Sequence, residues 1–96
     1  MQREEILRIL AEHKEELRRF DVKSLALFGS IARGEERADS DVDILVEFSK
    51  PVGLFEFIRL KRSLEGLLGR PVDLATPAAI REKMREQVLR EAVYAA

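Results

Sequence analysis

The stretch LFGSIARGEERADSDVDILV, residues 27–46, joins two apolar segments through a glycine-serine turn and a charged loop. The first segment, Val22 to Phe28, is short and largely apolar, which is typical of a buried strand. The second segment, Val42 to Phe48, is rich in branched and aromatic residues and predicts another strand. Because the connection between them is short, we expect the two strands to pair antiparallel.

The segments on either side of this stretch have the patterns of helices and one further strand. Residues 2–20 carry apolar side chains at helical spacing, and so do residues 52–68, which end at Gly69. Residues 71–74 predict a short third strand. A threonine-proline pair at residues 76–77 opens a last helix, in which the threonine would be the N-cap.

These elements follow the order αβ(α)βαβα, where the bracketed helix is a single turn near residues 31–35. The predicted fold class is therefore α/β (α+β), with a short three-stranded mixed sheet flanked by helices. The third strand follows a crossover helix, so it should lie parallel to the second strand and bring Asp73 near Asp43. We expect a single domain over residues 1–96, because a chain of this length buries one core.

The composition excludes several classes of protein. Apolar residues make up 46% of the chain and charged residues 36%, and no apolar run approaches the ~20 residues of a bilayer span, so no membrane insertion is expected. The net charge of −1 lacks the positive field that would hold a nucleic acid strongly. The absence of cysteine excludes disulfides and thiolate metal sites. The absence of cysteine, together with an amino terminus unlike a secretory signal, favours a cytoplasmic location.

The glycine-serine turn and the acidic residues after it have the chemistry of a metal-nucleotide site. Gly29 and Ser30 stand at the amino end of a helical turn, where backbone N–H groups can bind phosphate and glycine lets a ligand approach closely. Asp41 and Asp43 lie two apart, so their side chains share one face of the second strand. Two like charges so placed favour a cation, and Mg²⁺ commonly binds one or two carboxylates together with substrate phosphates.

Other interpretations of these residues stay open at this point. Asp73 would add the third carboxylate of a two-metal transfer centre, but it could also be a solvent-exposed residue of a short strand. Taken separately, the glycine-serine pair could be a simple tight turn and the two aspartates solvated loop residues. Arg33 either reaches the oxygens of a triphosphate or braces the charged loop of residues 35–39.

Two other motifs fail on residue chemistry. The aspartates of residues 39–43 imitate the first ligands of a calcium-binding EF-hand, but Ile44 and Lys50 occupy the positions that need glycine and glutamate. The glycine spacing of residues 29–34 opens a P-loop, but Glu35 stands where its lysine is required.

The glycine-serine pair, a ten-residue gap and an Asp-x-Asp pair resemble the signature of the DNA polymerase β nucleotidyltransferase superfamily. The flanking GSIARG and SDVDILV, together with the strand RPVDL of residues 70–74, are similar to the minimal nucleotidyltransferase branch of that superfamily. The resemblance covers nearly the whole chain. It implies a polymerase-β-type nucleotidyltransferase fold.

The resemblance also implies roles for individual residues. Ser30 would contact the triphosphate oxygens of ATP, and Asp41 and Asp43 would bind two Mg²⁺ ions. Asp73, as the third carboxylate, would help to activate the attacking hydroxyl.

A partner and an acceptor follow from the resemblance as well. Members of this branch pair with a helical HEPN-domain toxin as its antitoxin and transfer AMP from ATP to a tyrosine of that toxin. The chain could then form homo- or hetero-oligomers. The alternative is a non-catalytic antitoxin that neutralises its toxin by binding alone. A third interpretation, modification of a small molecule, is weaker because no added substrate domain is visible.

Overall fold

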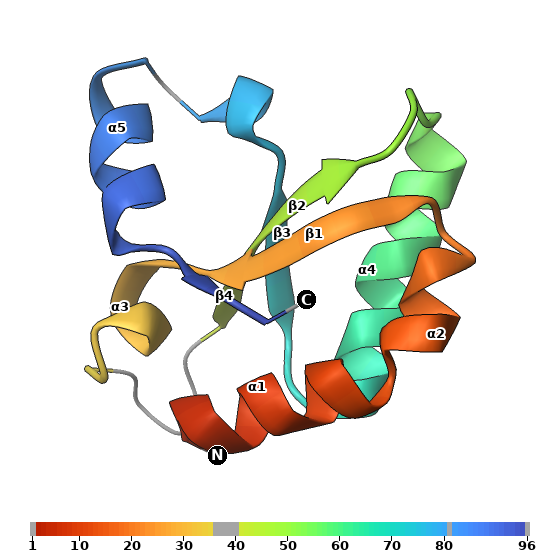
Figure 1. The fold of residues 1–96 in the computed structure, drawn as a ribbon, viewed down its shortest axis with the longest axis horizontal. Helices are drawn as coiled ribbons and strands as arrows, with labels where there is room; N and C mark the ends of the chain where they lie inside the picture. The colour runs from red at the N-terminus through yellow and green to blue at the C-terminus, as the bar shows by residue number, and fades with distance from the viewer. Residues whose placement is uncertain (1, 36–40, 81, 96) are drawn as a thin grey trace.

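The computed structural model describes residues 2–35, 41–80 and 82–95. The helices and strands follow one another along the chain in this order (Figure 1): α1 (Arg3–Glu12), α2 (Lys14–Arg18), β1 (Val22–Leu27), α3 (Gly29–Ala32), β2 (Val42–Phe48), α4 (Leu54–Leu68), β3 (Val72–Ala75), the 3-10 turn η1 (Pro77–Ala79), α5 (Glu82–Glu91) and β4 (Val93–Tyr94). Within the described segments, none of the helices is both long and apolar enough to cross a membrane.

The central sheet has the strand order β3-β2-β1-β4. β1 pairs antiparallel with β2, so that Leu27 lies opposite Ile44, and β2 pairs parallel with β3, so that Asp43 lies opposite Asp73. Both strand directions expected from the connection lengths are confirmed. On the outer edge of the sheet, the Val72 N–H donates to the Glu65 carboxylate at 3.0 Å, so a side chain from α4 holds the start of β3.

The expectation of three strands is wrong, because the described residues form a fourth. β4 pairs antiparallel with the free edge of β1, Tyr94 opposite Ala26 and Val93 opposite Leu27. The Ala95 N–H extends this pairing with a 2.8 Å hydrogen bond to the Leu25 carbonyl oxygen. A strand of two residues is too short to produce a readable alternation of apolar and polar side chains.

Two predicted helices also differ in extent. The helix expected over residues 2–20 divides into α1 and α2 at His13, whose backbone leaves the helical region with φ −106° and ψ 20°. The last helix begins at Glu82 instead of residue 77, because the chain becomes extended at Ile80 after η1. α4, by contrast, ends as expected at Gly69, which adopts the left-handed conformation with φ 66°.

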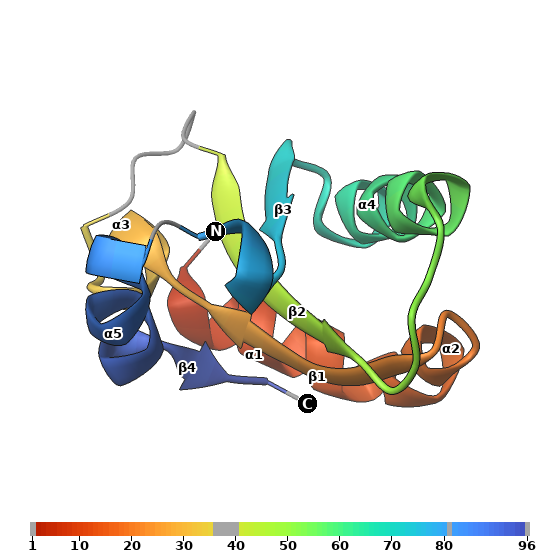
Figure 2. The same cartoon turned by 90° about the horizontal axis from the view of Figure 1, so that it is seen from above.

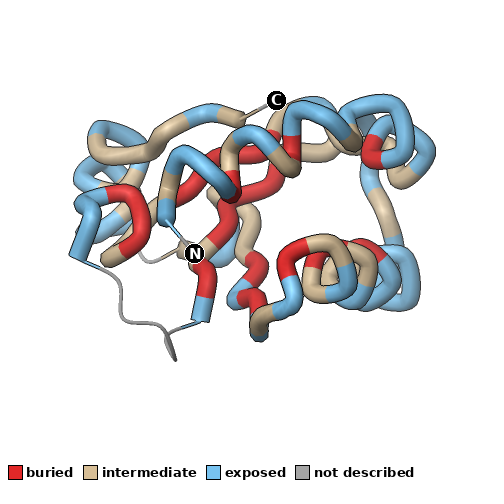
Figure 3. The backbone as a smooth tube through the Cα atoms, turned by 90° about the horizontal axis from the view of Figure 1, so that it is seen from below, coloured by how far each residue is buried: buried red, intermediate tan, exposed pale blue. Residues whose placement is uncertain are grey.

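The hydrophobic core lies between one face of the sheet and the helices α1, α2 and α4. Val42, Ile44 and Val46 of β2 are buried in this core, whereas Asp43 and Glu47 are half-buried on the opposite face, where Leu45 between them is also buried. Figure 3 shows the buried segments concentrated in the strands and in the helix turns that face them. Figures 1 and 2 agree that α3 and α5 lie together at one end of the sheet, with α4 at the other end. The face of β2 that carries Asp43 and Glu47 is therefore outside the main core.

Shortening a central core side chain should destabilise the fold. Ile44 is 0% exposed, and we expect Ile44→Ala to lower the free energy of unfolding by about 3 kcal/mol in urea denaturation, since it leaves a cavity beneath the sheet. Leu54, which is 71% exposed, is the control, and Leu54→Ala should change the same quantity by less than about 0.5 kcal/mol. Equal effects of the two substitutions would contradict this description of the core.

Candidate active site

Asp43 and Asp73 face each other across neighbouring parallel strands. Their Cα atoms are partners in the β2-β3 register, and such partners lie about 5 Å apart. Asp41 is exposed and precedes β2 by one residue. Burial, followed by the charge and hydrogen bonding of Asp73 and the charge of Asp41, raises the pKa of Asp43 to about 6. Three carboxylates thus share one region of negative potential.

Gly29 lies directly against the Asp43 carboxylate. The Phe28 N–H donates to the Asp43 carbonyl oxygen at 3.0 Å, which brings the turn after β1 beside Asp43. Gly29 has φ 67°, and a Cβ atom added there would overlap Asp43 Oδ2. Glycine is therefore required twice at this position, once for the backbone conformation and once for the space.

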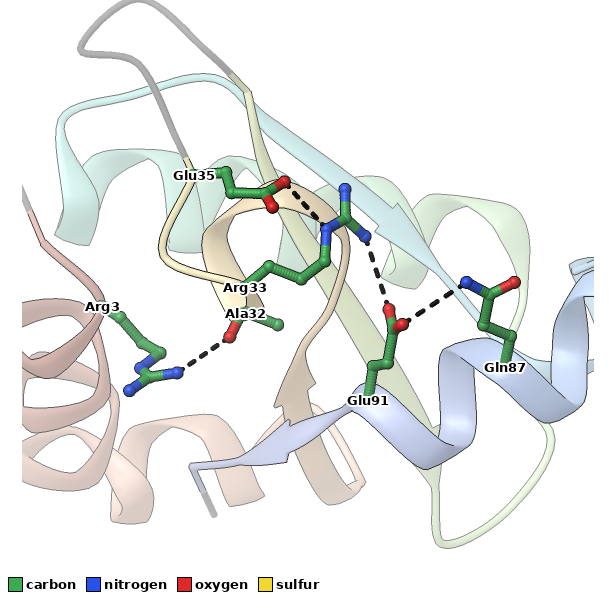
Figure 4. Close-up of polar contacts among 6 residues, drawn as sticks. All are labelled: Arg3, Ala32, Arg33, Glu35, Gln87 and Glu91. Atoms are coloured by element: carbon green, nitrogen blue, oxygen red, sulfur yellow. Dashed lines mark hydrogen bonds and ion pairs between the residues drawn. The ribbon is translucent and has the colours of Figure 1, made fainter.

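The turn that carries Ser30 is held from both sides. The Arg3 guanidinium of α1 donates to the Ala32 carbonyl oxygen at 2.8 Å (Figure 4). The Glu35 N–H donates to the Ser30 carbonyl oxygen at 2.9 Å. These contacts close α3 after a single helical turn. Ser30 itself is half-buried and, like Asp43, lines the cavity described below.

Arg33 extends from the end of this turn and makes two ion pairs. Its Nε donates to Glu35 at 3.0 Å, and its Nη1 lies 3.4 Å from a carboxylate oxygen of Glu91 on α5 (Figure 4). The contact with Glu35 is the kind of contact expected if Arg33 braces the charged loop. Residues 36–39 of the loop that it would brace, and the end of the loop at residue 40, lie outside the described residues.

A cavity of about 430 Å³ opens between α3 and α5. Four of the six predicted site residues line it: Gly29, Ser30, Arg33 and Asp43. The opposite wall comes from α5 and consists of Met84, Gln87, Val88 and Glu91. Asp41 and Asp73 lie beyond the described lining. A larger groove of about 760 Å³ lies at the opposite end of β2, but no predicted site residue lines it, so the smaller cavity is the candidate site.

The α5 wall is the part of the site that sequence reasoning missed. Met84 and Val88 are four residues apart in the sequence and therefore share one apolar face of the last helix, and such a face ordinarily covers a core. Here Met84 is 55% exposed and lines the cavity. The signal was present in the periodicity, but the neighbour of that face depends on tertiary packing.

The described residues fit a magnesium site that is completed by substrate. Among them, no group of three or more His, Cys, Asp or Glu side chains is arranged to hold a metal ion by itself. Mg²⁺ commonly uses only one or two protein carboxylates, with phosphates and water as its other ligands. Burial and the neighbouring charges of Asp73 and Asp41 raise the pKa of Asp43, and a divalent cation bound among these carboxylates would favour their charged forms. The metal roles of Asp41, Asp43 and Asp73 stay predictions.

Comparison with known proteins gives three independent likenesses. The family model described as a nucleotidyltransferase domain matches residues 10–95. The protein adenylyltransferase MntA of Thermococcus cleftensis is 50% identical over 92 residues, which cover 95% of this chain and 93% of the relative. A structure solved as a candidate minimal nucleotidyltransferase is 44% identical, with a TM-score of 0.82 over 97% of this chain and 95% of its own.

A more distant likeness shows the fold alone. A chain from the complex of a tri-AMPylated Shewanella oneidensis HEPN toxin with an MNT antitoxin has a TM-score of 0.65 at 19% identity. The match covers 94% of this chain and 71% of that one.

Replacing Gly29 should cost more than replacing another glycine of similar backbone conformation. Gly34 has φ 72°, but no atom lies within 4 Å of the position that a Cβ would take, so Gly34→Ala should lower the free energy of unfolding by only about 1 kcal/mol. Gly29→Ala carries the same backbone cost and also displaces the Asp43 carboxylate, and we expect a loss of about 2–3 kcal/mol in urea unfolding. A loss no larger than that of Gly34→Ala would show that the close approach is not a constraint.

The pKa of Asp43 predicts how stability depends on pH. Because the folded pKa of about 6 lies above the ordinary value of 3.8, protonation of Asp43 stabilises the folded state at low pH, and this stability is lost as the pH rises through 6. Asn imitates the protonated form. In EDTA, Asp43→Asn should therefore raise the free energy of unfolding by about 1–2 kcal/mol at pH ~8, allowing for solvent screening of a half-exposed group, and by much less at pH ~4. A pH-independent effect would contradict the assignment.

Proposed function

The chain belongs to the nucleotidyltransferase domain family, as an enzyme of its minimal, protein adenylyltransferase type, and we propose that it transfers AMP from ATP to a hydroxyl group of a partner protein. The family match spans residues 10–95. The relative with 50% identity is a protein adenylyltransferase, and the match to it covers 93% of its length. The family predicted from the glycine-serine turn and the aspartate pair is thereby confirmed.

The observation that carries the proposed reaction is the close grouping of Asp43, Asp73 and Gly29. Asp43 is opposite Asp73 in the sheet, and its Oδ2 occupies the space beside Gly29 where a side chain would otherwise stand. In the proposed site the Ser30 hydroxyl and the backbone of the turn bind the triphosphate. Asp41 and Asp43 would hold two Mg²⁺ ions, with Asp73 as a third carboxylate near Asp43. When bound, Mg²⁺ offsets the negative charge of the carboxylates and of the triphosphate.

The chemical step follows from these positions. The acceptor oxygen attacks the α-phosphorus of ATP in line with the leaving group. A new bond forms between that oxygen and phosphorus while the bond to pyrophosphate breaks. The proton of the acceptor hydroxyl passes to a carboxylate, for which Asp73 is the candidate because it is exposed beside Asp43. The products are an AMP-modified protein and pyrophosphate.

The acceptor that we propose is a tyrosine of a helical HEPN-domain toxin, for which this chain acts as the antitoxin. The support is the protein adenylyltransferase relative and the same fold in the complex of an AMPylated HEPN toxin with its MNT antitoxin. The reaction is proposed for the cytoplasm. The competing proposal is neutralisation by binding alone, in which the carboxylates are dispensable.

The test is AMP transfer to a purified HEPN-domain protein that is incubated with this chain. Incubation with ATP and Mg²⁺ should add AMP-sized increments to the partner in intact-mass spectrometry. The double variant Asp41→Asn/Asp43→Asn should slow the addition by about 100-fold or more, because several kcal/mol of charge stabilisation are lost. EDTA should stop it. Asp21→Asn, a surface carboxylate at the other end of β1, is the matched control and should leave the rate unchanged.

The outcomes separate the two proposals. Identical spectra for wild type and the double variant would overturn AMP transfer by this site. If the double variant still neutralises the toxin in growing cells as well as wild type does, binding alone is the function.

A further inference from the structure

The lining of the cavity between α3 and α5 contains two chemically different sets of side chains. Ser30, Arg33 and Asp43 contribute hydroxyl, guanidinium and carboxylate groups, and the proposed reaction uses this set for the triphosphate and metals. Phe28, Met84 and Val88 line the same cavity with an aromatic ring, a thioether and a branched aliphatic group. The proposed chemistry uses none of these three. A nucleotide has the same division, with a charged triphosphate and a flat, largely apolar base.

An exposed polar side chain, Gln87, also lines this cavity and contacts Glu91. Gln87 Nε2 donates to Glu91 Oε1 at 3.4 Å, while the other oxygen of Glu91 faces Arg33 Nη1, also at 3.4 Å (Figure 4). An ionised carboxylate only accepts hydrogen bonds, so the amide nitrogen of Gln87 is the group that faces Glu91. The Gln87 carbonyl oxygen is then available as an acceptor, and the second amide hydrogen as a donor.

We propose that the α5 wall of this cavity binds the base of the nucleoside triphosphate, with Met84 and Val88 against the ring face and the Gln87 amide at its edge, selecting adenine over guanine. The inference rests on the proposed function for the presence of a nucleotide. It goes beyond that function by assigning base selectivity to residues of α5, with Glu91 as the positioning residue.

The hydrogen-bonding groups explain the direction of selection. Adenine presents an amino donor next to a ring-nitrogen acceptor, and a glutamine amide pairs with both at once. At the equivalent edge, guanine presents its O6 acceptor where adenine has the amino group, so it would meet the Gln87 carbonyl oxygen acceptor to acceptor. A freely rotating amide could turn over to suit either base. The contact with Glu91 opposes that rotation, which is why the orientation of the amide matters.

α5 is held firmly enough to act as a wall. Arg85 donates from Nε to the Pro77 carbonyl oxygen at 2.9 Å and from Nη2 to the Ile80 carbonyl oxygen at 3.1 Å, which ties α5 to η1. At its other end the chain continues into β4, which is paired with β1. The cavity volume of about 430 Å³ lies within the range of small-ligand sites, so a base and its sugar fit together with part of the phosphate chain.

The test measures binding of AMP-PNP and GMP-PNP, with Mg²⁺ present, to the whole chain by isothermal titration calorimetry. Wild type should bind AMP-PNP at least about 10-fold more tightly than GMP-PNP. Gln87→Ala should weaken AMP-PNP about 5- to 10-fold and leave GMP-PNP nearly unchanged, so that the preference is lost. Glu91→Ala, which removes the acceptor of the Gln87 amide, should reduce the same preference by releasing that amide.

Control variants separate edge contacts from contacts with the ring face and from general damage. Met84→Ala and Val88→Ala should weaken both analogues by a similar factor and leave their ratio unchanged. Glu86→Gln alters an exposed residue of α5 that pairs with Arg90 outside the cavity, and it should change neither affinity. Inorganic tripolyphosphate, which has no base, should bind wild type and Gln87→Ala equally.

An unchanged AMP-PNP to GMP-PNP ratio in Gln87→Ala, with the variant folded as judged by its urea unfolding, would overturn the inference. It would also be overturned if Gln87→Ala slowed AMP transfer to the partner without changing nucleotide affinity, because the cavity would then receive the acceptor. Base-selective binding that depends on Gln87, in a chain that transfers no AMP, would support the inference while refuting the proposed function.

Discussion

The hydrogen bond from the Phe28 N–H to the Asp43 carbonyl oxygen, 3.0 Å long, is the contact that brings the glycine-serine turn to the acidic strand. It continues the antiparallel ladder of β1 and β2 by one residue beyond Leu27. Shifting that ladder by one residue would turn Asp43 into the core and Ile44 toward the cavity. The position of the turn, the carboxylate and the cavity wall therefore depends on a single strand register.

Apolar burial in the core stabilises that register, whereas repulsion between the carboxylates of the site lowers the stability of the fold. Ile44 and Leu27 are fully buried opposite each other, so apolar burial favours the observed pairing. On the other face, Asp43 lies beside Asp73, and the two carboxylates repel each other unless a proton or cation is present. Functional sites commonly retain such local strain, which the rest of the fold compensates. Glu65 contributes by holding β3, the edge strand that carries Asp73.

α5 connects the turn to the far wall of the cavity through one carboxylate. Glu91 contacts Arg33 of the turn and Gln87 of its own helix, so the phosphate-facing and base-facing sides share an ion-pair network (Figure 4). Both ion pairs of Arg33 are substantially exposed, and exposed pairs contribute little to stability. We therefore regard their main consequence as orientation of the side chains around the cavity.

The sequence by itself determined the first three strands and their directions, the α4 crossover and the grouping of Gly29 with Asp43 and Asp73. These depend on local periodicity, connection length and turn chemistry, all of which are visible along the chain. Only the tertiary structure decided that Val93–Tyr94 pairs with β1 and that the apolar face of α5 lines a cavity instead of a core. The physical reason is that a two-residue strand is too short to carry a periodic signal. The periodicity of a helix face shows that the face is apolar, but its neighbour is chosen by long-range packing.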